Sequence, residues 1–384
     1  MLDLATLRAR LAELSPGSPR LAAIDASDFV SVPLLRKSDF AALQQSNPPF
    51  AGVARSAGAF KRLFMSPGSI FEGEDHSEDT YGAKAAFAAA GFVSGEIVLN
   101  CFSYHLTPGG FIMESGAHAL GCAVIPAGPG NTEQTLQAIA HLKPTAYVGP
   151  PDFLKILLDK AGETSLRKAL VSGAALPASL RGELEARGVK VRQAFATAEL
   201  GLIAHETDGP DGALAPGMKV ADDVYLEIVR PGSGDPVAIG QVGEIVVTAL
   251  RGAFPLLRFA TGDLSAFLDA NPSALRNAAY IKGWMGRADQ TTKVKGMFVP
   301  PAAVVEVARR HPELKGVRLI VRREGELDSM ILLAETDAAS PALAAAVGAS
   351  LQATTKMRGA VEFVAPGSLP NDGKTIADER PAPA

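Results

Sequence analysis

The sequence predicts an α/β protein with a large N-terminal domain and a smaller α+β domain after it. Short apolar segments alternate with helical segments between residues 81 and 200. Near residue 212 this pattern gives way to strands separated by turn-rich segments. The length of 384 residues also exceeds what one hydrophobic core usually holds. We place the boundary at Arg287 to Gln290, which gives domains of residues 1–286 and 287–384.

Five apolar runs in the first domain have the composition of buried parallel strands. Each is short and bounded by glycine or proline, and helical segments separate them. This alternation predicts a parallel sheet with helices packed on its faces. The runs are GEIVLNC (95–101), GCAVIPAG (121–128), PTAYVGP (144–150), KALVSGA (168–174) and VKVRQAF (189–195).

The second half of the chain predicts two further regions. VYLEIV (224–229) and GEIVVTAL (243–250) flank the turn-rich PGSGDP and indicate an antiparallel, barrel-like subregion. From about residue 290 the order strand, helix, strand, strand, helix indicates the small α+β domain.

Composition and charge exclude several classes of protein. Hydrophobic residues make up 47% and charged residues 20%, as in a folded globular chain. The net charge is -4, and the sequence has no Lys/Arg-rich block with interleaved aromatic residues. We therefore do not expect nucleic acid as a partner. We find no signal-peptide pattern and no run of roughly 20 apolar residues. We therefore expect a cytoplasmic protein without a membrane span, in which Cys101 and Cys122 are buried thiols.

Two segments follow predicted strands at the sheet edge where α/β proteins bind ligands. In VSGAALP (171–177) the alternative to a binding loop is a tight turn that requires glycine. In QAFATAELG (193–201) the alternative for Glu199 is an acidic residue in the first turn of a helix.

Three isolated residues also leave two interpretations open. Asp263 in TGDL could hold the two hydroxyls of a ribose or belong to a type I turn. Lys374 follows Asn-Asp-Gly, where exposed lysines are common. His105 follows an apolar strand among aromatic and glycine residues, as a site histidine or a hydrogen-bonded loop histidine would. The six histidines lack the spacing of ligands to a transition metal.

The order and separation of these segments resemble the adenylate-forming acyl-CoA ligases, most closely the phenylacetate-CoA ligase family. The resemblance covers nearly everything after residue 28. It is carried by VPLLRKSDFAALQQSNPPFAG (32–52) and by the stretch from NCFSYHLTPGG (100–110) to PPDFLKIL (150–157). It implies the fold of that superfamily, in which the C-terminal domain is mobile.

The resemblance implies a nucleotide site at the two sheet-end segments. The family's Tyr-Gly-x-[ST]-Glu motif corresponds to residues 195–199, where Glu199 would hold Mg²⁺. Phe195 can stack on adenine, but Ala198 lacks the hydroxyl that reaches the α-phosphate. The remaining residues assigned to this site are Ser172, Gly173, Ala174, Ala175, Ala196 and Thr197.

The resemblance also assigns residues in the second half of the chain. Asp263 and Arg287 would contact the ribose, and Asp289 would be the hinge of the small domain. Gln290 replaces a second family acid. Lys374 matches the late lysine that the small domain contributes to adenylation.

The phosphate loop departs from the family pattern. MSPGSIFEGED (65–75) keeps Ser66, Gly68 and Ser69 but loses the second half of the loop. Three acids in its place carry charge of the wrong sign, and like charges about 4 Å apart cost roughly 1 kcal/mol in water. We expect weaker ATP binding unless Mg²⁺ or a turned-away geometry intervenes. The acids are Glu72, Glu74 and Asp75.

The implied function is that of a carboxylate-CoA ligase that uses ATP, Mg²⁺ and coenzyme A and forms an acyl-adenylate and then AMP. The substrate would be an aryl or small carboxylic acid, and the family allows a homodimer. Two alternatives remain: a non-catalytic protein that binds AMP or an acyl group, and an enzyme that passes the acyl group to another acceptor. The catalytic residues would be Lys374, Glu199 and His105, and the substrate pocket would contain Tyr104, His105, Gly149 and Ala196.

Overall fold

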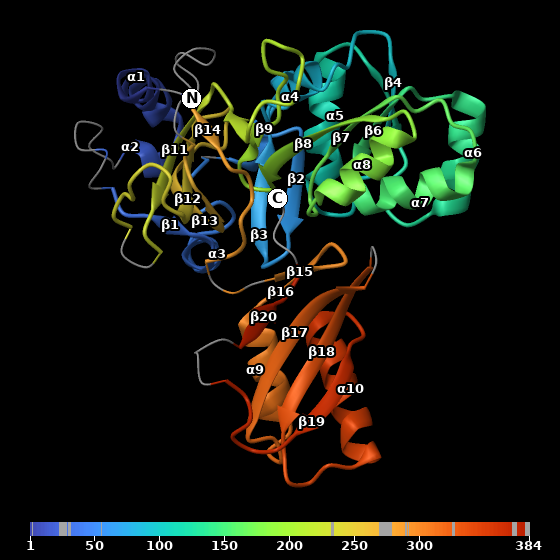
Figure 1. The fold of residues 1–384 in the computed structure, drawn as a ribbon. Coiled ribbons are helices and arrows are strands. Elements are labelled where there is room, and N and C mark those ends of the chain that lie inside the picture. The colour runs from blue at the N-terminus through green and yellow to red at the C-terminus, as the bar shows by residue number, and fades with distance from the viewer. Residues whose placement is uncertain are drawn as a thin grey trace. The chain divides into compact units, whose positions relative to one another are not determined.

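The computed structural model in Figure 1 divides into two compact units, Met1–Met285 and Gly286–Ala384. Each unit has its own hydrophobic core. The structure describes residues 1, 3–22, 29, 32–54, 56–231, 234–268, 279–288, 290, 292–324, 327–370 and 375–380.

The centre of the first unit is a mixed sheet. Within the described residues it has eight strands in the order β14-β10-β9-β8-β7-β6-β4-β5. Neighbours from β5 to β8 are parallel, and those from β8 to β14 are antiparallel. The predicted parallel sheet is therefore confirmed. The strands are β4 (Ile97–Asn100), β5 (Ala123–Pro126), β6 (Ala146–Gly149), β7 (Lys168–Val171), β8 (Lys190–Thr197), β9 (Gly201–His205), β10 (Met218–Val220) and β14 (Tyr280–Ile281).

Apolar residues of the parallel strands alternate between two layers. Val98 and Leu170 join a cluster with residues of α4 and α5, whereas their neighbours Leu99 and Ala169 join a cluster with α6, α7 and α8. Figure 1 shows α6, α7 and α8 grouped together beside the sheet. Because helices cover both faces of the sheet, side chains on both sides of each strand are buried. This burial explains why the strands are continuous apolar runs in the sequence. The helices are α4 (Lys84–Ala89), α5 (Gly109–Ala119), α6 (Thr132–Leu142), α7 (Pro151–Ala161) and α8 (Ala178–Ala186).

The predicted barrel-like subregion forms a second sheet with the order β1-β13-β12-β11. β11, β12 and β13 are antiparallel, and β1 is parallel to β13. RFATGDL continues as one strand through Asp263. The alternative interpretation of Asp263 as part of a type I turn is therefore wrong. The elements are β1 (Leu35–Arg36), β11 (Val224–Val229), β12 (Gly243–Ala249) and β13 (Leu256–Ser265), with helices α1 (Leu4–Leu14), α2 (Pro19–Ala22) and α3 (Lys37–Ser46).

The altered phosphate loop is an antiparallel hairpin of β2 (Arg62–Ser66) and β3 (Ile70–Glu74). Its turn contains Gly68 at φ 100 and Ser69 at φ 57, so the glycine supplies a conformation that other residues rarely adopt. The Gln44 side chain of α3 bonds both backbone groups of Phe71, at 2.6 Å to the carbonyl and 2.9 Å from the N–H. α3 therefore holds the hairpin in place.

The second unit contains a four-stranded sheet in the order β19-β18-β17-β20 and a separate two-stranded hairpin, among its described residues. The predicted order of strand, helix, strand, strand and helix is confirmed, although the sequence analysis missed β16, β19 and β20. The elements are β15 (Thr292–Val294), β16 (Met297–Val299), α9 (Pro301–Arg310), β17 (Gly316–Glu324), β18 (Leu327–Glu335), α10 (Pro341–Thr355), β19 (Ala360–Val364) and β20 (Ile376–Asp378).

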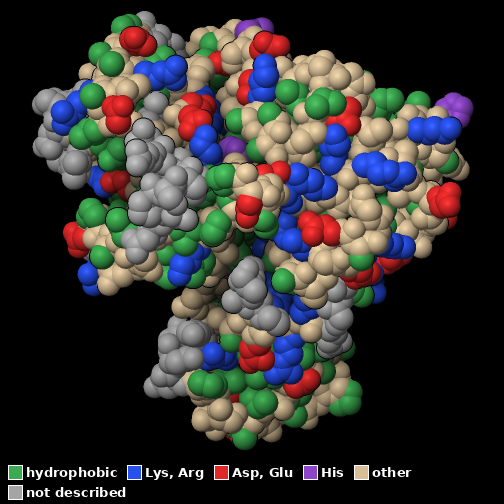
Figure 2. All heavy atoms as spheres, turned by 45° about the horizontal axis from the view of Figure 1, so that its top comes forward, with side chains coloured by type: hydrophobic (Ala, Val, Ile, Leu, Met, Phe, Trp, Pro, Cys, Tyr) green, Lys and Arg blue, Asp and Glu red, His purple; other side chains and the backbone are tan. Residues whose placement is uncertain are grey.

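Two observations concern the membrane and nucleic acid as partners. Among the described helices, none combines the length and apolar composition that crossing a bilayer requires. On the face drawn in Figure 2, acidic and basic side chains are interspersed.

His205 makes the stability of the first unit depend on pH. Its side chain is buried, and its Nδ1 has no hydrogen-bond partner among the described residues. Burial, aided by the charge of Lys219 and opposed by Asp222, lowers the pKa of His205 to about 4. An unfolded histidine has a pKa of about 6.5, so the folded state loses stability as pH falls from about 6.5 to 4.

We expect this histidine to reduce the free energy of unfolding by about 2 kcal/mol at about pH 5 relative to about pH 7. Urea unfolding of the wild type and His205→Gln at both pH values measures the effect, and the variant should lack this part of the decline. His141→Gln, which replaces an exposed histidine, should keep the wild-type decline. An equal decline in the wild type and His205→Gln would contradict the assignment.

Candidate active site

The parallel strands bring the predicted nucleotide and substrate segments to one edge of the sheet. β8, β7, β6 and β4 are consecutive neighbours, so their carboxyl ends lie side by side. Ligands of α/β proteins bind beyond such ends. The predicted residues at or directly after these ends are Tyr104 and His105 after β4, Gly149 in β6, Ser172, Gly173, Ala174 and Ala175 after β7, and Phe195, Ala196, Thr197 and Glu199 at the end of β8.

Glu199 lies in the tight turn that joins β8 to β9. Thr197 and Gly201 are paired across this turn, and the Leu200 N–H donates to Thr197 Oγ1 at 3.3 Å. Gly201 has φ 70, and a Cβ there would lie 2.7 Å from the Tyr81 carbonyl oxygen. The alternative that Glu199 begins a helix is therefore wrong, because a hairpin positions it.

Lys37 forms an ion pair with Glu199 that the sequence analysis missed. Lys37 is the first residue of α3, and its Nζ lies 2.6 Å from Glu199 Oε1. The Glu199 side chain is 2% exposed, whereas that of Lys37 is 36% exposed. Burial opposes ionisation of Glu199, but the charge and hydrogen bond of Lys37 outweigh it, and the pKa of Glu199 is lowered.

Glu72 is the acid of the hairpin that faces Glu199. Its Oε1 accepts a 2.5 Å hydrogen bond from Ser66 Oγ, and both residues are buried. Burial and the negative charge of Glu199 raise the pKa of Glu72 to about 8, while Ser66 and Lys37 act in the opposite direction. The hydroxyl of Ser66, one of the residues that the loop keeps from the family pattern, thus donates to this carboxyl group.

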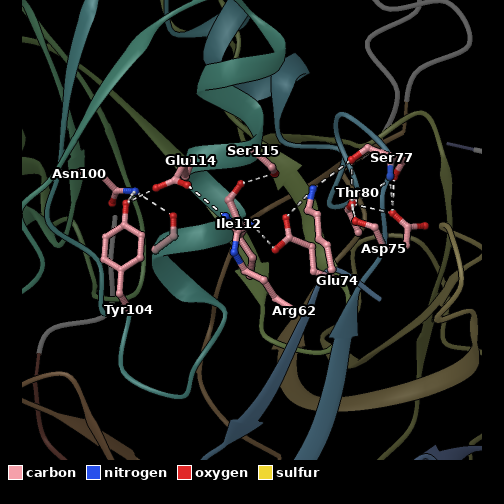
Figure 3. Close-up of polar contacts among 12 residues, drawn as sticks. Arg62, Glu74, Asp75, Ser77, Thr80, Asn100, Tyr104, Ile112, Glu114 and Ser115 are labelled. Carbon is pink, nitrogen blue, oxygen red and sulfur yellow. Dashed lines mark hydrogen bonds and ion pairs between the residues drawn. The ribbon is translucent and has the colours of Figure 1, made fainter. Parts of the chain in front are cut away.

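Glu74 is turned into the protein and neutralised there. It is 1% exposed and accepts from Arg62 Nη1 at 2.8 Å, with Lys61 Nζ at 3.1 Å. Figure 3 shows Glu74 beside Arg62. This is the turned-away geometry that the sequence analysis left open.

Asp75 is also occupied by internal hydrogen bonds. It accepts from Ser77 Oγ at 2.5 Å, Thr80 Oγ1 at 2.7 Å and the Ala253 N–H at 3.0 Å, and Figure 3 shows the first two. Of the three acids whose charge is wrong for a phosphate loop, Glu72 is the one on which the charge of Glu199 acts, whereas Glu74 and Asp75 have partners of their own.

Tyr104 connects the loop after β4 to the hairpin. Its hydroxyl accepts from Asn100 Nδ2 at 2.8 Å and donates to Glu114 Oε2 at 3.0 Å (Figure 3). Arg62 continues the network, with its guanidinium 3.8 Å from Glu114 and 4.4 Å from the centroid of the Phe111 ring. The tyrosine hydroxyl is therefore engaged within the protein.

His105 lies at the same edge of the sheet, whereas Asp263 and Arg287 lie in other parts of the fold. His105 is exposed in the loop after β4. Asp263 lies in β13, where its Oδ1 accepts from Trp284 Nε1 at 2.9 Å. Arg287 belongs to the second unit, with its guanidinium 5.8 Å from the centroid of the Phe298 ring. Asp289 and Lys374 are outside the described residues, so their roles stay predictions.

Comparison of the sequence with known families identifies relatives over most of the chain. A family profile described as "AMP-binding enzyme" matches residues 78–251. The phenylacetate-coenzyme A ligase of Aromatoleum evansii is 28% identical over 80% of this chain and 72% of that protein. The phenylacetate-coenzyme A ligase of Thermus thermophilus is 31% identical over 65% of this chain and 58% of that protein.

Solved structures share the fold. A 2-hydroxyisobutyryl-CoA ligase in complex with 2-HIB-AMP and CoA aligns with a TM-score of 0.79 at 22% identity, over 98% of this chain and 89% of that one. The amide bond synthetase McbA from Marinactinospora thermotolerans aligns with a TM-score of 0.59 at 20% identity, over 81% and 66% of the two chains. The α/β fold expected from the sequence is thus that of adenylate-forming enzymes.

Proposed function

Because the chain belongs to the adenylate-forming AMP-binding enzymes of the phenylacetate-CoA ligase family, we propose that it is an ATP-dependent carboxylate-CoA ligase. The carboxylate attacks the α-phosphorus of ATP, giving an acyl-adenylate and pyrophosphate. The thiol of coenzyme A then attacks the acyl carbon and releases AMP. The observation that carries this proposal is the buried Glu199 carboxylate, held by a hairpin turn at the ligand-binding edge of the sheet.

The residues at this edge fit a magnesium ion bound with ATP. Mg²⁺ prefers oxygen ligands and is commonly held by one or two carboxylates together with substrate phosphates. Glu199 would hold the ion, and its low pKa favours the ionised form that a ligand requires. When bound, the metal would neutralise charge on the phosphates.

Several residues would position the nucleotide and neutralise the charge of its phosphates. Phe195 would stack on the adenine, and Ser172 to Ala175 would form the adjoining wall of the pocket. Gly68 and Ser69 are exposed at the tip of the hairpin, where their backbone N–H groups would bind phosphate oxygens. Asp263 and Arg287 would hold the ribose, and Lys374 would neutralise charge that develops during adenylation.

An aryl or small aliphatic acid is the proposed substrate class. The relatives are phenylacetate-coenzyme A ligases, and the first structural neighbour carries a 2-hydroxyisobutyryl adenylate. The hydroxyl of Tyr104 is bonded to Asn100 and Glu114, so its ring would line the acyl pocket. His105 would lie near the entering thiol. The expected cytoplasmic location and homodimer stay predictions.

Pyrophosphate release with a panel of aryl and short-chain acids tests the proposal. Each acid is supplied with ATP and Mg²⁺, with and without coenzyme A. Release that needs only the acid, followed by thioester formation when coenzyme A is added, is the expected result. Adenylation without a thioester would favour another acyl acceptor. AMP binding without release for any acid would favour a non-catalytic protein, which is the alternative that the acidic Glu72 in the phosphate loop supports.

A further inference from the structure

The surroundings of Glu199 contain buried polar atoms that no described residue satisfies. Glu72 Oε2 and the Tyr81 hydroxyl are both buried and have no hydrogen-bond partner among the described residues. The Tyr81 carbonyl oxygen accepts from the Leu202 N–H of β9 at 3.0 Å, and burial and the charges of Glu74 and Glu72 raise the pKa of its hydroxyl. A buried polar atom without a partner is costly, so each such atom needs an explanation, and a bound ligand is one.

Glu72 is oriented for such a ligand by its own hairpin. Ser66 Oγ, on the opposite strand, binds Glu72 Oε1 at 2.5 Å and so fixes the carboxyl group. This contact leaves Oε2 as the oxygen that can bind something else. A hydrogen bond that fixes a carboxylate in this way is typical of residues that support metal ligands.

The charges of the cluster also favour a cation. Glu72 and Glu199 interact electrostatically, and Lys37 interacts with both. Within the described part of the chain, Lys37 is thus the lysine that acts on both carboxyl groups, whereas Glu74 has both Lys61 and Arg62. A divalent ion would displace the proton that Glu72 holds near neutral pH and would compensate the two carboxylates more completely than one ammonium group does.

We propose that Glu72 is a second carboxylate ligand, beside Glu199, for the divalent cation that accompanies ATP. This inference rests on the proposed function. It explains the altered phosphate loop. Glu72 would repel a bare phosphate group, but it can bind a phosphate group indirectly when both are ligands of the same metal ion. Mg²⁺ held by two carboxylates and by phosphate oxygens is a common arrangement.

Binding of Mn²⁺ together with α,β-methylene-ATP tests the proposal without turnover. The dissociation constant of Mn²⁺ is measured by electron paramagnetic resonance for the wild type and Glu72→Gln, which keeps the size and the acceptor for Ser66. We expect Glu72→Gln to weaken Mn²⁺ binding at least about tenfold. Glu114→Gln, which removes an acid bonded to Tyr104, should stay within about twofold of the wild type.

Binding of AMP without metal serves as the test of folding. The inference is overturned if Glu72→Gln binds Mn²⁺ as tightly as the wild type, or more tightly, while Glu199→Gln loses Mn²⁺ affinity. That outcome leaves the proposed function intact. Absence of Mn²⁺ binding in a wild type that still binds AMP overturns both. If Glu72→Gln does not fold, Glu72→Asp replaces it, and weakened Mn²⁺ affinity with normal AMP affinity supports the proposal, whereas unchanged Mn²⁺ affinity overturns it.

Discussion

Replacing Glu199 by glutamine is expected to lower kcat/KM for pyrophosphate release by about 10²–10³-fold. The variant keeps the size of the side chain but removes the charge that would hold the metal and pair with Lys37 at 2.6 Å. Lys37 is 36% exposed, so water can solvate its ammonium group after the change. Initial rates at saturating ATP and Mg²⁺, with the acid varied, measure the effect.

Glu206→Gln is the matched control for the loss of a buried acid. Glu206 is also buried, and it accepts from Arg181 at 2.6 Å and from the Gln193 N–H at 2.7 Å. Its loss should lower stability while leaving activity per folded molecule unchanged. If Glu199→Gln releases pyrophosphate as fast as Glu206→Gln, Glu199 has no part in adenylation.

The parallel sheet was predictable because its signal is local. Each strand is a short apolar run between glycine or proline, and burial on both faces removes the polar alternation. Val98 and Leu99 illustrate this, since they belong to different hydrophobic clusters. Once these strands are in order, residues after their carboxyl ends must share one edge of the sheet.

The charge environment of the phosphate loop was not predictable from local sequence. Glu72, Glu74 and Asp75 occur almost consecutively, yet their partners come from different segments. Glu74 pairs with bases at the start of the hairpin, whereas Asp75 accepts from the Ala253 N–H. Lys37 reaches Glu199 from α3. Charges of adjacent residues therefore say little about which of them faces a ligand.

Gln290, a departure from the family pattern, has a structural task in this chain. The sequence indicates only that it replaces an acid. In the structure its Oε1 accepts from the Thr375 N–H at 3.0 Å. An amide oxygen accepts this bond as a carboxylate oxygen would, but it carries no negative charge.

Lys374→Ala is expected to lower the rate of adenylation by about 10²–10³-fold while leaving thioester formation from a supplied acyl-adenylate intact. The described chain resumes at Thr375, which Gln290 anchors, and β20 is then paired with β17. Thr375, the residue after Lys374 in the sequence, is thus anchored just before β20. A lysine that stabilises charge on the phosphates is needed for adenylation but not for the attack of the thiol on the acyl carbon.

Two assays on the same variant distinguish this role from a general loss of folding. Pyrophosphate release reports adenylation, and conversion of a synthetic acyl-adenylate and coenzyme A reports thioester formation. Lys315→Ala, which removes an exposed lysine of the same unit, should change neither rate. Equal losses in both reactions for Lys374→Ala would indicate a structural defect, and two unchanged rates would remove Lys374 from the mechanism. Only a loss confined to adenylation fits a lysine that acts on the phosphates of ATP.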